Sequence, residues 1–232
     1  PHPPAETENT MLQCAEKLQS HATFGSLAFV IVEGLREAKK AATRRALASA
    51  VVHLAARDGL DRVTAEDIAA EANVSVRTYH NYFASKEDAL QFYMAEVMAE
   101  LLERLQGSDP ALPLNKAIWD ALIDVCCDSA GAPTPATMLL RLFDTEPRVH
   151  SVSSAQQIEE CRQQFEEYFE RRCPDVDPLY CWLVLTSGVG AIRLAVELWT
   201  EGATGGRTLR ETIEVSVRQL DAGFDAPVLR MA

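Results

Sequence analysis

The sequence predicts an all-α protein with a small three-helix head and a larger helical body behind it. Apolar residues recur at intervals of three and four through most of the chain, which is the period of an amphipathic helix. Ser or Thr residues stand directly ahead of several of these segments, where they can cap helix N-termini. Clusters of Gly and Pro, such as residues 107–110 and 131–135, separate the segments.

The charge of the chain is unevenly distributed. Its 232 residues carry a net charge of −12, and 47% of them are hydrophobic, which is enough for a sizeable core. Residues 36–86 contain nine Lys or Arg and six Asp or Glu, so this segment carries +3 and the remainder carries −15. A basic head on an acidic body favours docking of a polyanion through the head alone.

Residues 1–35 form an extension, and the head, residues 36–90, follows it. Thr10 to Gln13 is a capping box that predicts an extra helix over about residues 11–20. The head opens on a long helix with five basic residues in its first ten positions, and Gly59 ends it. Arg44 and Arg45 can contact a nucleic-acid backbone or minor groove, and the alternative is a solvated helix face.

Two short helices joined by a tight turn come next. Thr64 caps the first, and Asp67 is placed to bond back to the cap. Asn73 stands at the end of this helix and tolerates the left-handed conformation that the exit needs. Ser75 then caps the second helix. This arrangement is a helix-turn-helix, which presents its second helix to the major groove of DNA.

The second short helix has one apolar and one polar face. Val76, Tyr79 and Phe83 recur at three and four residues and predict the buried stripe. Polar side chains around this stripe can hydrogen-bond base edges or phosphates. The candidate DNA contacts in and before this helix are Thr64, Ser75, Arg77, Thr78, His80, Asn81 and Tyr82.

A further helix, predicted over residues 85–106, joins the head to the body without a flexible linker. Ser85 caps it, and Lys86 lies in its first turn. A lysine there opposes the helix dipole, so the sequence predicts an anion such as a DNA phosphate beside Lys86. Because the helix is continuous, tilting it would move the recognition helix.

From Arg44 to Leu90 the sequence resembles the DNA-binding domain of the TetR family of bacterial transcriptional regulators. Asn73 departs from the usual pattern, where a turn glycine is common, and His80 stands where a tyrosine is frequent. The matching positions are Thr64, Ile68-Ala69, Ala72, Val74-Ser75, Thr78, Tyr82-Phe83 and Ser85-Lys86-Glu87.

The resemblance implies that residues 91–232 form a helical domain for effector binding and dimerisation. It also implies a cytoplasmic, ligand-responsive regulator, most often a repressor, that binds a palindromic DNA operator as a homodimer. A small-molecule effector would release it. Apolar periodicity and breaks place the body helices after residue 106 at about 113–129, 135–144, 149–172, 179–198 and 208–224.

The last two helices, about residues 178–201 and 208–224, are the predicted homodimer interface. The first of them is apolar nearly all the way round, which indicates burial on more than one side. Gly188 and Gly190 would allow another backbone to approach closely. We therefore expect a four-helix bundle with a second subunit. No uninterrupted apolar run reaches transmembrane length, so no membrane partner is expected.

The family resemblance also implies a small-molecule pocket among the helices between about residues 113 and 200. Arg193 is the sharpest candidate because an arginine in an apolar helix needs an anionic partner, which Glu197 or an acidic ligand can supply. For each of the other candidates, ordinary core packing is the alternative. The candidate lining residues are Trp119, Cys126, Met138, Phe143, Phe165, Phe169, Trp182 and Arg193.

No motif in the sequence indicates an enzyme. A glycine-rich phosphate loop, H-E-x-x-H and G-x-S-x-G are all absent, so no catalytic residue and no cofactor are expected. The six cysteines form no C-x-x-C pair and no zinc-like spacing with the histidines, so no metal is expected and the thiols should be free. The second hypothesis is a DNA-binding or protein-interaction protein of the same fold that has no small-molecule effector.

Overall fold

The structure is a computed structural model that describes residues 35–145 and 155–223, with the side chains of 143–145 and 155–158 outside the description. The chain divides into two compact units, residues 1–45 and 46–232. In the first unit, residues 35–45 are helical; in the second, residues 46–58 are helical. The predicted extension over residues 1–34, with its extra helix, lies outside the described residues.

The helix-turn-helix follows residue 58 and consists of three short elements. Gly59, with a φ of 85°, ends the preceding helix as predicted. A 3₁₀ turn that the sequence pattern did not predict then leads into the two short helices. The elements are η1 (Leu60–Arg62), α2 (Ala65–Glu71) and α3 (Val76–Tyr82).

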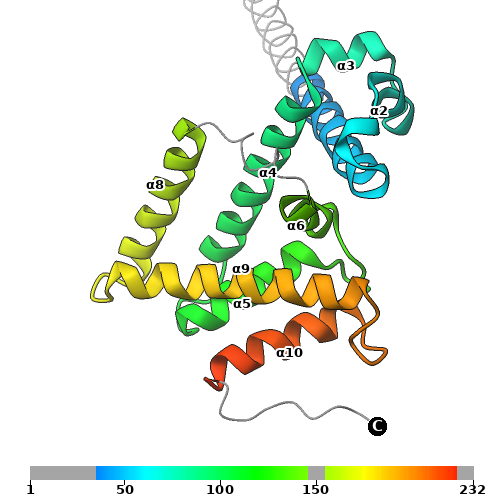
Figure 1. The fold of residues 1–232 in the computed structure, drawn as a ribbon. Coiled ribbons are helices and arrows are strands. Elements are labelled where there is room, and N and C mark those ends of the chain that lie inside the picture. Colours follow the sequence, from blue (N-terminus) through cyan, green and yellow to red (C-terminus); the bar gives the residue numbers. More distant parts are fainter. Residues whose placement is uncertain (1–34, 146–154, 224–232) are drawn as a thin grey trace, which may run out of the picture. The chain divides into compact units, whose positions relative to one another are not determined.

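The body consists of helices, and the longest of them is α9. Figure 1 shows α9 crossing α5, with α10 alongside, and these helices pack directly against one another. The body helices are α4 (Lys86–Gln106), α5 (Leu114–Cys126), α6 (Pro135–Thr145), α8 (Ala155–Arg172), α9 (Pro178–Thr200) and α10 (Leu209–Asp221). The prediction of an all-α head and body is confirmed.

Local capping explains where the head helices begin. The Thr64 hydroxyl accepts a hydrogen bond from the Asp67 amide at 3.2 Å, and the Asp67 carboxylate accepts one from the Thr64 amide at 3.1 Å. This is the predicted capping box. The Thr64 hydroxyl also donates to Asp67, and these bonds hold the pKa of that carboxyl below its ordinary value. The Ser75 and Ser85 hydroxyls cap α3 and α4 by accepting hydrogen bonds from the Thr78 and Asp88 amides.

The body core contains a close contact between α5 and α9. Trp119 is buried, and its indole ring lies against Gly188 of α9. A Cβ atom at Gly188 would lie 3.0 Å from Trp119 Cδ1 and 3.0 Å from Leu122 Cδ1. Two large buried side chains leave no room for that atom, so Gly188 makes space for the side chains of Trp119 and Leu122, whereas the sequence predicted the approach of another backbone.

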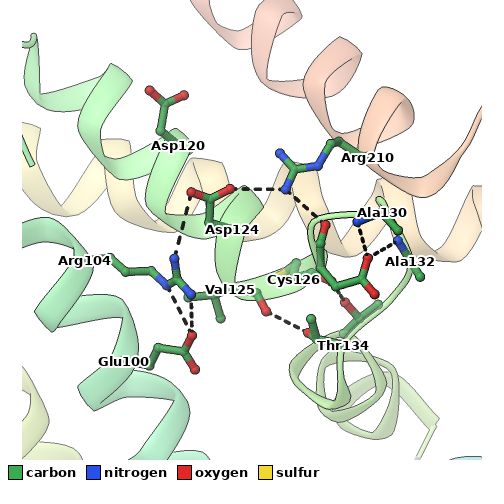
Figure 2. A network of polar contacts seen from close by, with 12 residues as sticks. Glu100, Arg104, Asp120, Asp124, Val125, Cys126, Ala130, Ala132, Thr134 and Arg210 are labelled. Carbon is green, nitrogen blue, oxygen red and sulfur yellow. Dashed lines mark hydrogen bonds and ion pairs between the residues drawn. The ribbon is translucent and has the colours of Figure 1, made fainter.

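Ion pairs join α4, α5 and α10 at one end of the body. Arg104 of α4 lies 2.7 Å from Glu100 and 3.9 Å from Asp124 of α5. On the other side, Arg210 of α10 lies 3.2 Å from Asp124 and also donates to the Asp128 carbonyl oxygen at 3.5 Å. Figure 2 shows Asp124 between the two guanidinium groups. These groups are partly exposed, so each pair contributes little stability and the network serves mainly to orient the helices.

Candidate DNA interface and effector cavity

The turn between α2 and α3 sets the direction of the recognition helix. Asn73 adopts a φ of 54°, and the Val74 amide donates to the Ala69 carbonyl oxygen at 2.9 Å. This left-handed residue reverses the chain within four residues, as predicted for Asn73 in place of a glycine. The turn therefore places the start of α3 directly beside the end of α2.

The inner side of α3 anchors it to the head. Tyr79 is 3% exposed and Phe83 is 1% exposed, so the predicted apolar stripe is buried. Burial raises the pKa of the Tyr79 phenol to about 12, which keeps it neutral. Val76 and Tyr82 are half-buried, and Tyr82 packs against the same core. Tyr82 is thus part of the packing of the head as well as a candidate DNA contact.

The outer side of α3 carries the free polar groups. Arg77, His80 and Asn81 are exposed, and their spacing of i, i+3 and i+4 places them on one face of the helix. The other candidates are engaged within the head. The Ser75 and Thr78 hydroxyl oxygens lie 2.7 Å apart, and the Thr64 hydroxyl is bonded to Asp67. Direct base reading is therefore expected from Arg77, His80 and Asn81.

The two remaining candidates from the basic segment, Arg44 and Arg45, are exposed residues of the first unit. Each makes an interaction of its own within the described structure. Their exposure is compatible with a phosphate contact and with a solvated helix face, so both interpretations from the sequence remain open.

Lys86 has hydrogen-bond partners within the chain. Its ammonium group donates to the Leu60 carbonyl oxygen at 2.6 Å and lies 3.4 Å from the Val63 carbonyl oxygen. These carbonyls belong to η1 and to the residue that follows it. The side chain is half-buried and ties the first turn of α4 to the segment that leads into α2. Its first role is therefore to hold the head together.

Replacing Lys86 by methionine should lower the free energy of unfolding by about 1–3 kcal/mol, because the Leu60 carbonyl oxygen loses its charged donor. DNA binding should weaken for all sequences, while the slope of log affinity against log salt stays the same. A direct phosphate contact would instead reduce that slope by about one. Urea unfolding and salt titrations of DNA binding measure the two effects. Lys116→Met, on the exposed face of α5, controls for the lost charge.

A cavity of about 60 Å³ lies among α4, α5, α6 and α9. Its wall is entirely apolar apart from the thiol of Cys126. Helix α4 supplies four of the lining side chains, Met94, Val97, Met98 and Leu101. These four stand at i, i+3, i+4 and i+7, a spacing that could have identified them from the sequence. They were nevertheless missed, because the predicted pocket began at residue 113.

Of the predicted pocket residues, Cys126 lines this cavity. Phe165, Phe169 and Trp182 instead form an aromatic cluster between α8 and α9, with the Phe169 and Trp182 ring centroids 5.6 Å apart and edge to face. Their packing is that of ordinary core residues. Trp119 lies against Gly188, away from the cavity wall.

Two further candidates, Met138 and Arg193, also lie elsewhere. Met138 packs against the head core through α6. The side chain of Phe143 is not among those that the structure describes. Arg193 is exposed on α9 and does not line this cavity. The physical reason is that α9 keeps only one face in the core, and Arg193 lies on the other.

That outer face of α9 carries an apolar stripe beside Arg193 and Glu197. Four leucines at positions 179, 183, 194 and 198 are between 38% and 64% exposed. They lie on one stripe with Ser187 and Gly190 at its centre. A Cβ atom at Gly190 would meet nothing within 4 Å, so the middle of the stripe is open.

Helix α10 differs from α9. Its apolar stripe of Leu209, Ile213 and Val217 is buried against its own chain. The apolar surface left for a partner is therefore mainly on α9.

Helix α9 is long and apolar enough to cross a membrane by length and composition, although Arg193 and Glu197 interrupt its apolar run. This helix has 23 residues and a mean hydropathy of 1.6 over its most apolar 18-residue window, which satisfies the length and composition of a membrane span. Its inner face, however, packs against α5 and α10 in the core of the body. The high hydropathy arises because one helix serves this core with one face and exposes leucines on the other.

Comparisons with known proteins agree with this architecture. Residues 47–91 match the sequence model of the bacterial regulatory proteins of the tetR family. No curated protein sequence matches the chain significantly.

Solved structures cover the head and the body together. The fatty acid degradation regulator FadR from Bacillus halodurans is 18% identical, and the alignment covers 80% of this chain and 97% of FadR with a TM-score of 0.55. A TetR-family transcriptional regulator from Haemophilus influenzae is 17% identical, with 78% and 97% covered and a TM-score of 0.52. Residues 47–91 therefore match the DNA-binding domain of the tetR family, and the chain as a whole shares the fold of these solved regulators.

Proposed function

We propose that the protein is a repressor that binds a palindromic DNA operator as a homodimer and leaves it when a small molecule enters the body. The main support for this proposal is that a single helix, α4, extends from the head to the cavity in the body. The helix starts at the Ser85 cap, where Lys86 fastens it to the segment leading into α2. Two to four turns later the same helix lines the apolar cavity. One rigid element thus connects a ligand site with the DNA-reading surface.

The exposed face of α3 supports base reading in the major groove. Arg77 can donate two parallel hydrogen bonds to O6 and N7 of guanine. Asn81, one helical turn further on, can form the corresponding pair with N6 and N7 of adenine. His80 lies between them and can donate or accept through its ring nitrogens. A half-site that contains guanine and adenine contacts about one helical turn of α3 apart is therefore expected.

The exposed stripe on α9 supports a homodimer. Burying the four leucines against their copies would remove a large apolar surface from water, and Ser187 and Gly190 would let the two helices approach closely where they cross. A two-fold dimer carries two copies of α3, so the operator should consist of two inverted half-sites. Cytoplasmic location follows from this function, because the operator is bacterial chromosomal DNA.

Release of the operator would follow from enlargement of the cavity. A ligand that pushes Met94, Val97 and Met98 outward moves the wall that α4 provides. Because Lys86 ties α4 to the head, that movement changes the separation of the two recognition helices in a dimer. The ligand then favours the conformation that no longer matches both half-sites, which is a coupling between two binding equilibria.

The operator can be identified without knowing the regulated genes. Duplexes selected by the protein from a random-sequence pool should contain inverted repeats, and fluorescence anisotropy should show two subunits per duplex. A screen of small molecules against this complex should then yield compounds that release the DNA. Selected sites without two-fold symmetry would contradict the dimeric repressor. Tight symmetric binding that no compound weakens would favour the second function, a regulator of this fold without an effector.

A further inference from the structure

The walls of the cavity offer no free polar group to a ligand. Among the described residues, the buried side-chain polar atoms without a hydrogen-bond partner are Trp119 Nε1 and Arg172 Nε, and neither residue lines the cavity. Burial raises the pKa of the Cys126 thiol to about 12, so this group stays neutral. The cavity therefore presents only hydrocarbon, thioether and thiol surface.

The backbone next to the cavity is also satisfied. The Thr134 hydroxyl donates to the Val125 carbonyl oxygen at 2.7 Å, and the Thr134 amide donates to the Cys126 carbonyl oxygen at 3.1 Å. Thr137 adds a second hydrogen bond to the same Cys126 carbonyl. Figure 2 shows Thr134 beside the end of α5, where it occupies these acceptors. A charged ligand group placed here would lose its hydration without gaining a partner.

A second, larger hollow lies on the surface, and its charged side chains do not select a ligand of either charge. It lies between α5 and α10 and is lined by seven charged residues together with Trp119, Ile123 and Val217. Lys116 pairs with Asp120 at 2.7 Å, Arg210 with Asp124 at 3.2 Å, and the Asn115 amide donates to Asp221 at 2.6 Å. Because these groups already have partners, they do not select an ion of either sign.

Resting on the ligand-responsive regulator proposed above, we infer that the effector is an uncharged, apolar molecule whose hydrocarbon part enters the cavity among α4, α5, α6 and α9. An apolar cavity of about 150 Å³ in another protein is known to hold benzene. The present cavity, at about 60 Å³, must therefore widen to accept a molecule of that size. Met94 and Met98 are half-buried and flexible, and they allow this widening on the side of α4.

The matched ligands 1-octanol and octanoate test the inference directly. In thermal denaturation, 1-octanol should raise the midpoint in proportion to the logarithm of its concentration, since it binds the folded state. Across the series from 1-butanol to 1-octanol, affinity should rise about fourfold for each added methylene. Octanoate should bind at least about 30-fold more weakly than 1-octanol. Equal binding of octanoate, or no binding of any alcohol, would overturn the inference.

Two variants locate the binding site. Ala136→Leu fills the cavity from α6 and should abolish the effect of 1-octanol. Ala99→Leu makes the same change on the exposed face of α4 and should leave binding unchanged. If Ala136→Leu does not fold, Leu140→Ala provides the opposite change, which enlarges the cavity and should raise the affinity several-fold. Retention of full binding by folded Ala136→Leu, or unaltered affinity in Leu140→Ala, would place the ligand elsewhere.

Different experimental results would contradict the inferred ligand class and the proposed regulatory function. Stabilisation by 1-octanol without release of the selected operator would leave the ligand class standing and contradict ligand-controlled repression. Release of the operator by charged compounds alone would support the regulator and overturn the apolar effector.

Discussion

Replacing Leu194 by glutamate is expected to convert the proposed homodimer to monomers and to abolish tight operator binding. Leu194 is 53% exposed in the single chain and lies in the centre of the apolar stripe on α9. Burial of one leucine contributes about 2 kcal/mol, and a two-fold interface contains two copies, so losing both weakens the dimer by about 4 kcal/mol. This corresponds to an approximately 10³-fold higher dissociation constant. The cost of burying two carboxylates adds to that loss.

Sedimentation velocity and anisotropy with the selected operator measure the two consequences. The fold of the monomer should survive, because the Leu194 side chain points away from the core of its own chain. Val176→Glu is the matched control, since Val176 is 39% exposed in the loop between α8 and α9, outside the stripe. It should leave both dimer and operator affinity unchanged. A Leu194→Glu protein that remains dimeric would show that the subunits meet through another surface.

The head could be predicted from the sequence almost completely, because its signals are local. Thr64 and Asp67 form a capping box that depends on residues three positions apart, and Asn73 supports a turn within four residues. The buried stripe of Tyr79 and Phe83 follows from helical spacing alone. Each of these features is decided by neighbours along the chain, so the sequence contains the information needed.

The helices of the body could be predicted from the sequence, but most of the residues that line its cavity were not. The pattern of α9 indicates a helix that is apolar all round, and it does not say which face meets the core and which meets solvent. Arg193 was therefore placed in the pocket, although it lies on the outer face. Long-range packing decides which face of α9 is buried. The Trp119 side chain of α5 packs against Gly188, and this contact fixes the rotation of α9 about its axis. Such a contact joins residues about seventy positions apart and leaves no periodic signal.

Lys86 shows a different limit. Its unfavourable position at a helix N-terminus was recognised correctly as a sign that a partner was needed. The sequence predicts an anion there, and the structure adds the carbonyl oxygens of Leu60 and Val63, which supply the negative end of a dipole. The 3₁₀ turn that presents the Leu60 carbonyl was not predicted, because it is only three residues long. A missed short element thus changed the interpretation of a long-range contact.

Replacing Arg77 by alanine is expected to remove most of the sequence preference of the protein. Arg77 is exposed on the outer face of α3, and a bidentate contact between an arginine and guanine contributes about 1–3 kcal/mol of discrimination. The dimer contains two such contacts, so the affinity for the selected operator should fall by about 2–6 kcal/mol, or about 30-fold to 10⁴-fold. Affinity for unrelated DNA should fall much less, because phosphate contacts dominate nonspecific binding.

Competition anisotropy with the selected operator and with variants at each position of its half-site measures this effect. For Arg77→Ala, substitutions of one guanine per half-site should become nearly neutral, while substitutions at the other positions keep their cost. Arg218→Ala removes the same charge from the exposed face of α10 and should leave the profile unchanged. A uniform loss of affinity with an intact profile would identify Arg77 as a phosphate contact. Base recognition would then have to come from His80 and Asn81, the other two exposed polar residues on that face of α3.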